Sequence, residues 1–344
     1  MKIVFFGTPE YVLPILESLH KSFKNPKSES GIVAVVTQKP KPTGRKQIIT
    51  YSPVDAWAHK KNVPIFYKSE DLIKNRVKAD IGVLAAYGEF IPKFVISHLS
   101  FVILNIHPSL LPLWRGSSPV QASIIAGDKI TGATIIKIDE LLDHGPIVSA
   151  FKEEILPDDT NESLRKRLFE RSAEVAVALL PAYIKGKITP RPQLHEKATY
   201  TTQIKKSDAF IPPKYISANL QGETLQAQWE IPFMNTKYSQ ASLIKNYSLV
   251  PNAYTLDCFI RAMQPWPVSW TYVQLGKRQE VKGKQSLPLR GKRLKILKAH
   301  VEKTQFTVHR SPYTKLVLDE VQLEGKNPVS WKQFKEAYTT AIFE

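Results

Sequence analysis

The chain has 344 residues, which is more than one ordinary hydrophobic core holds, so its length suits two domains. Its 43% hydrophobic and 23% charged residues fit a soluble globular protein without a membrane span or signal peptide, and the single cysteine, Cys258, excludes a disulfide framework and a cysteine-based zinc site. The net charge of +17 is spread over both halves and favours a polyanionic partner, most often nucleic acid, with a generally basic proteome as the open alternative.

The first half alternates short β-rich runs with helical patterns, which is typical of a parallel sheet with crossover helices. We expect strands at Lys2–Phe6, Ile32–Thr37, Ile81–Ala85, Val102–Ile106, Thr131–Ile138 and Ile147–Phe151. We expect helices from an N-cap at Thr8 to about Phe23, from a cap at Ser52 to Lys61, and over Asn161–Lys185. The sequence therefore predicts an α/β, Rossmann-like domain with a mostly parallel sheet over residues 1–190.

The second half carries short β-like runs with turn signals, after an extended polar linker over residues 191–207. The runs are Val268–Leu275, Leu294–Ala299 and Leu316–Leu323, with one helix at Thr255–Met263. This pattern favours a smaller antiparallel β-barrel of the OB type over residues 208–344, with Trp266 and Trp270 packed in its core. Residues 214–253 are extra sequence to which we assign no role.

The densest group of chemically able residues begins at the end of the strand near residue 104, in the segment NIHPSLLPLWRGSSP. Asn105 and His107 are two residues apart on an extended chain, so their side chains share a face. An amide donor can stabilise an oxyanion and an imidazole can handle a proton near neutral pH, which suits acyl transfer at the carboxyl end of a strand. A turn asparagine and a structural histidine are the alternative.

Asp143 lies in a tight turn, Leu141–Pro146, between the last two strands expected in the first half. Its carboxylate could orient His107, as carboxylates commonly do for imidazoles, with ordinary turn chemistry as the alternative. His144 beside it is expected to be a surface turn residue. No glycine-rich dinucleotide or phosphate loop follows the predicted strands, so a dinucleotide enzyme is not expected.

A basic loop over Lys39–Thr50 is punctuated by prolines and a glycine and contains no acid. Its cations are Lys39, Lys41, Arg45 and Lys46. A loop of this composition suits contacts with phosphates, and a solvated charged loop is the alternative.

Long stretches of the chain resemble the methionyl-tRNA formyltransferase family, within the wider folate-dependent formyltransferases. They include FFGTPE at the start, VTQKPKPTGR at 36–45, LAAYGEFIPK at 84–93, NIHPSLLPLWRGSSPVQASIIAGD at 105–128, LLDHGPI at 141–147 and RAMQPWPVSW at 261–270. The resemblance is nearly continuous over residues 1–205 and weaker beyond. The Pro-Trp-Pro segment and the basic loop favour the enzymes that act on tRNA.

The resemblance implies a full set of functional residues for this chain. The catalytic residues of the family fall on Asn105, His107 and Asp143. Its folate-binding residues fall on Ser109, Leu110, Leu111 and Pro112, and on Ala86, Tyr87 and Gly88, and its tRNA-binding loop on Lys39, Lys41, Arg45 and Lys46. The implied reaction moves a formyl group from 10-formyltetrahydrofolate to the amine of methionyl initiator tRNA, for translation initiation. The implied enzyme is a cytoplasmic monomer that needs no metal.

Two alternatives stay open at this point. Sugar-nucleotide N-formyltransferases and glycinamide-ribonucleotide formyltransferase share the catalytic triplet, but they give no reason for two basic domains. A non-catalytic RNA-binding protein with a formyltransferase-like core would explain the charge, but it would not explain an intact Asn105, His107 and Asp143.

Overall fold

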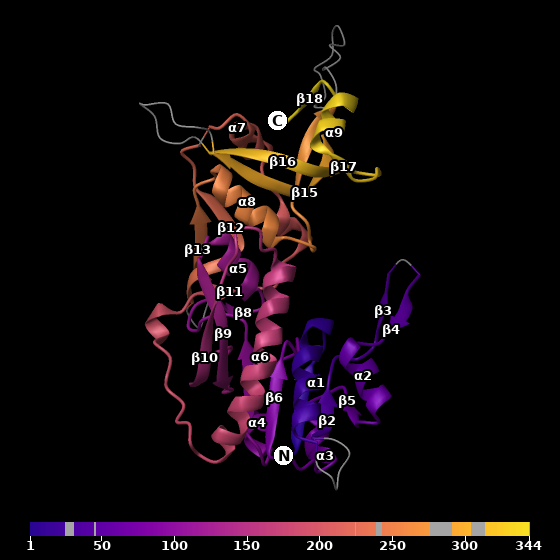
Figure 1. Ribbon diagram of the computed structural model, residues 1–344, viewed down its shortest axis with the longest axis vertical. Helices are drawn as coiled ribbons and strands as arrows, with labels where there is room; N and C mark the ends of the chain where they lie inside the picture. Colours follow the sequence, from indigo (N-terminus) through magenta and orange to yellow (C-terminus); the bar gives the residue numbers. More distant parts are fainter. Residues whose placement is uncertain are drawn as a thin grey trace. The chain divides into compact units, whose positions relative to one another are not determined.

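A seven-stranded sheet organises the first part of the chain, with the strand order β10-β9-β7-β6-β1-β2-β5 (Figure 1). Its strands are β1 (Ile3–Gly7), β2 (Ile32–Val36), β5 (Ile65–Phe66), β6 (Ile81–Ala85), β7 (Ile103–His107), β9 (Ile130–Lys137) and β10 (Ile147–Glu154). Strands β7, β6, β1, β2 and β5 pair in parallel, and β9 and β10 add two antiparallel strands at one edge. The predicted α/β fold with a mostly parallel sheet is confirmed.

The computed structural model describes residues 1–24, 31–44, 46–223, 225–238, 243–275, 291–303 and 314–343. The chain divides into two compact units. The first comprises Met1–Pro119, Ile130–Glu154 and Ser163–Tyr200, and the second comprises Val120–Lys129, Ile155–Glu162 and Thr201–Glu344. Two short segments from the first half of the sequence therefore belong to the second unit, and the units interleave along the chain.

Helices cover both faces of the seven-stranded sheet, because side chains along each buried strand alternate between them. Ile3 and Phe5 pack with one helix layer, while Val4 and Phe6 pack with the other. The first layer contains α1 (Leu13–Ser22), α2 (Pro53–Lys61) and α6 (Asn161–Ile184), and the second contains α3 (Asp71–Lys74) and α4 (Lys93–His98). Burial of apolar side chains on both faces stabilises the sheet. Polar residues of a site are then expected at the ends of the strands.

The helix starts show one correct and one wrong prediction. Ser52 caps α2 as expected, since its Oγ accepts a hydrogen bond from the backbone N–H of Asp55 at 3.0 Å. Thr8 does not cap a helix, because a 3₁₀ turn over Glu10–Val12 comes first and α1 begins only at Leu13. The Thr8 hydroxyl instead donates to the carbonyl oxygen of Tyr87 at 2.8 Å. It thereby ties together the loops that follow β1 and β6.

The second unit contains an antiparallel, curled sheet with the strand order β17-β16-β15-β14-β18, which confirms the antiparallel β structure predicted for this half. The strands are β14 (Trp270–Leu275), β15 (Lys292–Lys303), β16 (Thr314–Leu323), β17 (Val329–Ser330) and β18 (Ala341–Ile342). The register between β15 and β16 shifts on both sides of Lys298, and such bulges bend a strand pair. Helix α8 (Ala253–Ala262) begins after Asn252, two residues before the predicted start.

The described part of residues 214–253, to which the sequence assigned no role, includes a helix and a strand pair in the second unit. It contains most of α7 (Pro213–Leu220) and the antiparallel pair β12 (Trp229–Tyr238) and β13 (Leu243–Leu249). Trp229 is buried, with its ring 4.5 Å from that of Phe259 and 5.7 Å from that of Tyr215, measured between centroids. The segment therefore contributes to the core of this unit.

The two tryptophans expected in the core differ in their exposure. Trp266 is 49% exposed, so its predicted burial is wrong. Trp270 is half-buried, and its indole N–H donates to the carbonyl oxygen of Lys206 at 2.9 Å. The apolar character of a residue type alone does not decide which tryptophan lies inside, because much of a folded surface is apolar.

Several short elements complete the secondary structure. They are β3 (Lys41–Thr43), β4 (Ile48–Thr50), β8 (Arg115–Gly116), α5 (Pro119–Ile125), β11 (Tyr200–Thr201), α9 (Trp331–Ala337), and the 3₁₀ turns His195–Lys197 and Lys206–Ala209. Over the residues that the structure covers, we find no helix with the length and apolar character that crossing a membrane requires.

Candidate active site

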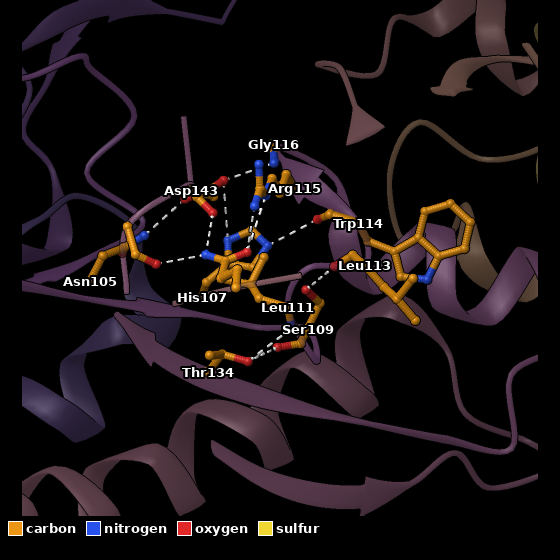
Figure 2. A network of polar contacts seen from close by, with 12 residues as sticks. Asn105, His107, Ser109, Leu111, Leu113, Trp114, Arg115, Gly116, Thr134 and Asp143 are labelled. Atoms are coloured by element: carbon orange, nitrogen blue, oxygen red, sulfur yellow. Dashed lines mark hydrogen bonds and ion pairs between the residues drawn. The ribbon is translucent and has the colours of Figure 1, made fainter. Parts of the chain in front are cut away.

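Asn105 and His107 lie at the carboxyl end of β7, which is between β9 and β6 in the sheet. Both are buried, although each carries polar atoms, so each needs hydrogen-bond partners. Their spacing of two on a strand gives their side chains a common direction, and Figure 2 shows both beside Asp143. Ligands of such folds bind beyond the carboxyl ends of the parallel strands.

The structure brings together the three residues that the sequence proposed as catalytic. The Nδ2 of Asn105 donates to the Oδ1 of Asp143 at 3.0 Å. The Nδ1 of His107 lies 3.5 Å from the Oδ2 of the same carboxylate (Figure 2). The Asp143 side chain is only 9% exposed, so this carboxylate meets its partners with little water around it.

The ring of His107 faces an acceptor at each nitrogen. Its Nε2 lies 3.0 Å from the carbonyl oxygen of Trp114, and a carbonyl can only accept, so Nε2 carries a proton. Its Nδ1 faces the Asp143 carboxylate, which in its ionised form is also only an acceptor. Both ring nitrogens therefore face acceptors, and the closer of the two is the Trp114 carbonyl oxygen.

The turn that carries Asp143 has a constrained backbone. Asp143 has a φ of 49°, in the left-handed region, where aspartate is tolerated better than most residues. Its Oδ2 accepts a hydrogen bond from the backbone N–H of Gly116 at 2.8 Å. Two residues on, a Cβ at Gly145 would lie 1.8 Å from the carbonyl oxygen of Lys137, so only glycine fits there. The tight turn thus holds the carboxylate over the end of β7.

The segment Ser109–Pro112 is held by hydrogen bonds inside the protein. Ser109 is fully buried, and its hydroxyl donates to the carbonyl oxygen of Leu113 at 2.6 Å. The hydroxyl of Thr134 donates to the Ser109 carbonyl oxygen at 2.6 Å and accepts from the N–H of Leu111 at 3.0 Å. Leu111 is buried, and Leu110 and Pro112 are half-buried. The sequence did not single out Thr134, which joins this segment to β9.

The loop Ala86–Gly88 follows β6, the neighbour of β7. Ala86 and Gly88 both have positive φ values, 46° and 81°, and the carbonyl oxygen of Gly88 accepts from the Nε2 of Gln38 at 3.1 Å. Tyr87 is buried; burial first, and then the neighbouring Glu89, raises the pKa of its hydroxyl far above its usual value. The loop borders the same edge of the sheet as Asn105 and His107.

The predicted basic loop is a two-stranded hairpin of β3 and β4. Lys39, Lys41 and Lys46 are all exposed, and Arg45 lies outside the described residues. The hairpin also exposes apolar side chains that the sequence analysis missed: Ile48 is 62%, Ile49 55% and Tyr51 54% exposed. These residues follow the cations closely in the sequence, and this pattern could have predicted an amphipathic surface.

A second polar network, absent from the sequence analysis, adjoins the carboxylate. Arg115 is buried, and its guanidinium donates to Gln193 and to the Nδ1 of His195. The His195 ring stacks on His144 with 4.0 Å between centroids, and desolvation, followed by the charges of His144 and Arg115, lowers the pKa of His195. His144, expected on the surface, is partly exposed and its Nδ1 lies 2.7 Å from Asp139.

Metal ligands were not expected from the sequence. The part of the chain that the structure describes has no group of three or more histidine, cysteine, aspartate or glutamate side chains placed to hold a metal ion.

Two family models match the chain. The model described as formyl transferase matches residues 1–180, and the model described as formyl transferase, C-terminal domain, matches residues 251–339. The first match covers the seven-stranded sheet, the residues at the carboxyl ends of its strands and most of α6. The second covers α8 and the strands β14 to β17 of the five-stranded sheet.

Curated relatives align with most or all of the chain. A methionyl-tRNA formyltransferase from Buchnera aphidicola subsp. Schizaphis graminum is 34% identical over 281 residues, which cover 79% of this chain and 76% of the relative. A methionyl-tRNA formyltransferase from Dictyoglomus turgidum is 30% identical over 369 aligned residues, which cover 100% of this chain and 98% of the relative.

Solved structures share the fold. A 4-N formyltransferase from Francisella tularensis matches with a TM-score of 0.52 at 18% sequence identity, and the match covers 79% of this chain and 92% of that chain. At this identity the likeness concerns the fold alone.

Proposed function

The chain belongs to the formyl transferase family, and from this premise we propose that it formylates the amino group of methionyl initiator tRNA, with 10-formyltetrahydrofolate as the formyl donor. The observation that carries the proposal is the constellation of Asn105, His107 and Asp143 at the open end of β7. The relative from Dictyoglomus turgidum, named a methionyl-tRNA formyltransferase, matches the whole of this chain and supports the choice of acceptor.

The proposed site stabilises the charge that develops on the formyl oxygen when the neutral amine attacks the formyl carbon. The Asn105 amide has two N–H groups and gives one to Asp143, so the other remains as a donor to this oxygen. The Nδ1–H of a protonated His107 is the second donor that we assign, because at 3.5 Å from the Asp143 carboxylate it makes no ordinary hydrogen bond there. Two donors preorganised in a buried site act on the transition state without the cost of reorienting water.

Asp143 has the complementary task in this proposal. The amine must lose a proton as the new C–N bond forms, and the folate nitrogen must gain one as the old C–N bond breaks. A carboxylate between Asn105 and His107 can accept the proton from the amine and pass it to the folate nitrogen, directly or through water. None of the three residues acts as a covalent nucleophile.

The formyl donor is proposed to lie between the segments Ser109–Pro112 and Ala86–Gly88. Large apolar side chains stand exposed on the neighbouring segments, as an aromatic ligand requires: Phe90, Leu141 and Leu142 are 65%, 57% and 59% exposed. The Nζ of Lys93 and the carboxylate of Glu140 lie 2.6 Å apart and join these segments. The residues present therefore fit a folate, which supplies the formyl group.

The tRNA is proposed to contact the basic hairpin, with Lys39, Lys41, Arg45 and Lys46, and the strand β15. Strand β15 exposes Lys292, Arg293, Lys295 and Lys298 in the second unit. Together with a net charge of +17, these cations suit a polyanion of many phosphates better than a small nucleotide sugar. We place the reaction in the cytoplasm and propose that the enzyme acts as a monomer.

A competition between acceptors tests the proposal. The full chain is incubated with 10-formyltetrahydrofolate and either methionyl initiator tRNA or an amino-sugar nucleotide, and formyl transfer to each is measured. We expect transfer to the tRNA only. Transfer to the sugar nucleotide alone would replace the proposed acceptor, and RNA binding without transfer to either would leave a non-catalytic RNA-binding protein.

A further inference from the structure

We infer that Gln193 is a positioning residue for catalysis, which acts by holding the turn that carries Asp143. The inference rests on the proposed role of Asp143 in formyl transfer. Gln193 lies 50 residues along the chain from Asp143, in a segment that the sequence suggested was a plain linker. It makes no contact with the reacting atoms in this account, so its effect must pass through the carboxylate.

The side-chain amide of Gln193 uses its whole hydrogen-bonding capacity. Its Nε2 donates to the carbonyl oxygen of Asp143 at 2.9 Å and to that of Gly145 at 2.8 Å. Its Oε1 accepts from the Nη2 of Arg115 at 2.7 Å and from the Nε of Arg115 at 3.3 Å. With the residue only 5% exposed, two donors and two acceptor sites are all satisfied by the protein.

Arg115 determines which way the amide points. A guanidinium can only donate, so it selects the oxygen of Gln193, and the amide nitrogen must then face the turn. The guanidinium is itself held, since Nη2 also donates to the Nδ1 of His195 at 2.8 Å and Nη1 to the hydroxyl of Tyr200 at 3.4 Å. The orientation of Gln193 therefore follows from a buried charge and not from its own rotamer preference.

These two hydrogen bonds hold a turn whose preceding residues lie outside the core. Asp143 adopts a left-handed backbone, which persists in a protein only where the surroundings enforce it. The residues before it, Leu141 and Leu142, are exposed and do not anchor the turn in the core. Gln193 holds the carbonyls on both sides of His144, and Gly116 holds the carboxylate itself.

The consequence for catalysis is geometric. Asp143 contacts Asn105 at 3.0 Å and His107 at 3.5 Å, and both contacts are lost if the turn moves by about 1 Å. Without the carboxylate, the Nδ1 of His107 loses the contact that orients its ring. Gln193 thus orients His107, a residue that it does not touch, through the position of Asp143.

The variant that tests this is Gln193→Glu, which keeps the size of the side chain and the oxygen toward Arg115. It replaces the two N–H donors with an oxygen that repels the carbonyls of Asp143 and Gly145. We expect kcat to fall about 100-fold, as for a misplacement of about 1 Å, while the KM for tRNA stays within a factor of two. A fall in melting temperature with unchanged kcat would mean a structural role only and overturn the inference.

The chain offers a matched control at Gln264 in the second unit. Its Nε2 also donates to two backbone carbonyls, those of Ile296 at 3.3 Å and Leu297 at 2.8 Å. Gln264→Glu removes the same kind of contact and is expected to lower the melting temperature but leave kcat unchanged. An equal loss of kcat in both variants would count against a specific role for Gln193.

A double-variant cycle shows whether Gln193 acts through Asp143. In an Asp143→Asn background, Gln193→Glu should lower kcat by less than about threefold, because the positioned group is already gone. Effects of the two substitutions that multiply would contradict the inference. Gln193→Met, which removes all four hydrogen bonds with a side chain of similar length, repeats the cycle if Gln193→Glu does not fold.

A readout independent of activity separates this inference from the proposed function. The side-chain nitrogen resonances of His107, assigned by their loss in His107→Ala, report its contact with a carboxylate. We expect Gln193→Glu to shift them toward the values seen in Asp143→Asn. Resonances identical to wild type would overturn the inference even if the enzyme is active, and an inactive wild-type chain would refute the proposed function alone.

Discussion

The backbone N–H of Gly116 donates to the Oδ2 of Asp143 at 2.8 Å, across 27 residues of sequence. Asn105 donates to the other carboxylate oxygen, so each oxygen has a defined donor. Gly116 follows Arg115, whose guanidinium orients the Gln193 amide that donates to the carbonyl oxygen of Asp143. Gly116 thus holds the carboxylate of Asp143 through a main-chain N–H. Its neighbour Arg115 holds the backbone of Asp143 indirectly, through Gln193.

Removal of either proposed oxyanion donor should cost activity far more than stability. We expect Asn105→Ala to lower kcat about 100- to 1,000-fold, and His107→Ala about 100- to 10,000-fold. His107→Ala also removes the hydrogen bond from Nε2 to the Trp114 carbonyl oxygen, so a loss of about 1–3 kcal/mol in the free energy of unfolding accompanies it. Turnover and urea unfolding are measured on the same samples. Near-wild-type turnover in either variant would remove that residue from the proposed site.

Gly145→Ala should damage the site from a position that does not touch it. The new Cβ would lie 1.8 Å from the Lys137 carbonyl oxygen, so the turn with Asp143 must shift. We expect a loss of activity of about 100-fold or more. Gly186→Ala is the control: it also places a Cβ on a special backbone, with a φ of 70°, but nothing lies within 4 Å. It should cost about 1 kcal/mol of stability and no activity.

Binding of tRNA should depend on salt and on the basic hairpin. Each phosphate contact contributes about −0.7 to −0.9 to the slope of log affinity against log salt concentration. We expect a steep slope for tRNA, a flat one for the folate, and a slope reduced by about one contact in Arg45→Ala. Lys60→Ala, which removes one exposed charge from α2, is the control and should leave the slope unchanged. A tRNA affinity that does not change with salt concentration would favour a small-molecule formyl acceptor.

Tyr67→Phe tests a hydrogen bond to a fully buried carboxylate. The Tyr67 hydroxyl donates to the Oδ2 of the fully buried Asp55 at 2.8 Å, and burial followed by this carboxylate raises the pKa of Tyr67 to about 12. Because the folded pKa exceeds the unfolded value near 10, the neutral hydroxyl stabilises the fold below pH 10, and this contribution is lost as pH rises toward 12. We expect Tyr67→Phe to cost about 1.5 kcal/mol near neutral pH.

The check is the difference in the free energy of unfolding between wild type and Tyr67→Phe, measured from pH 7 to pH 11.5. The difference should be constant up to about pH 10 and shrink above it. A difference that stays constant over the whole range would show that the hydroxyl does not titrate with a raised pKa in the folded protein.

Local sequence patterns predicted those parts of the site that one strand or one turn builds. The spacing of Asn105 and His107 on an extended chain was enough to place both on one face, and the turn residues around Asp143 located its loop. Arg115 and Gln193 were beyond this reasoning, because their partnership joins positions 78 residues apart. A buried glutamine in a polar segment carries no local mark of burial.

The errors have the same origin. Thr8 has the chemistry of a helix cap, but its hydroxyl donates to the loop after β6, 79 residues away. Trp266 has the apolar bulk of a core residue, but its neighbours in space leave half of it exposed. Residue type and spacing describe what a side chain can do, whereas distant segments decide which option it takes.

The interleaving of the two units bears on the order in which a ribosome releases the chain. The second unit includes residues 120–129 and 155–162 as well as its large C-terminal part, and contacts bind these pieces together. Arg261 donates to the Asp159 carbonyl oxygen at 2.6 Å, and Lys129 to the Tyr254 hydroxyl at 3.0 Å. At a synthesis rate of about 5–20 residues per second, Arg261 is added to the chain at least several seconds after Asp159. A nascent first half therefore carries two pieces of surface whose partners do not yet exist, and a fragment cut at residue 200 would keep that defect permanently.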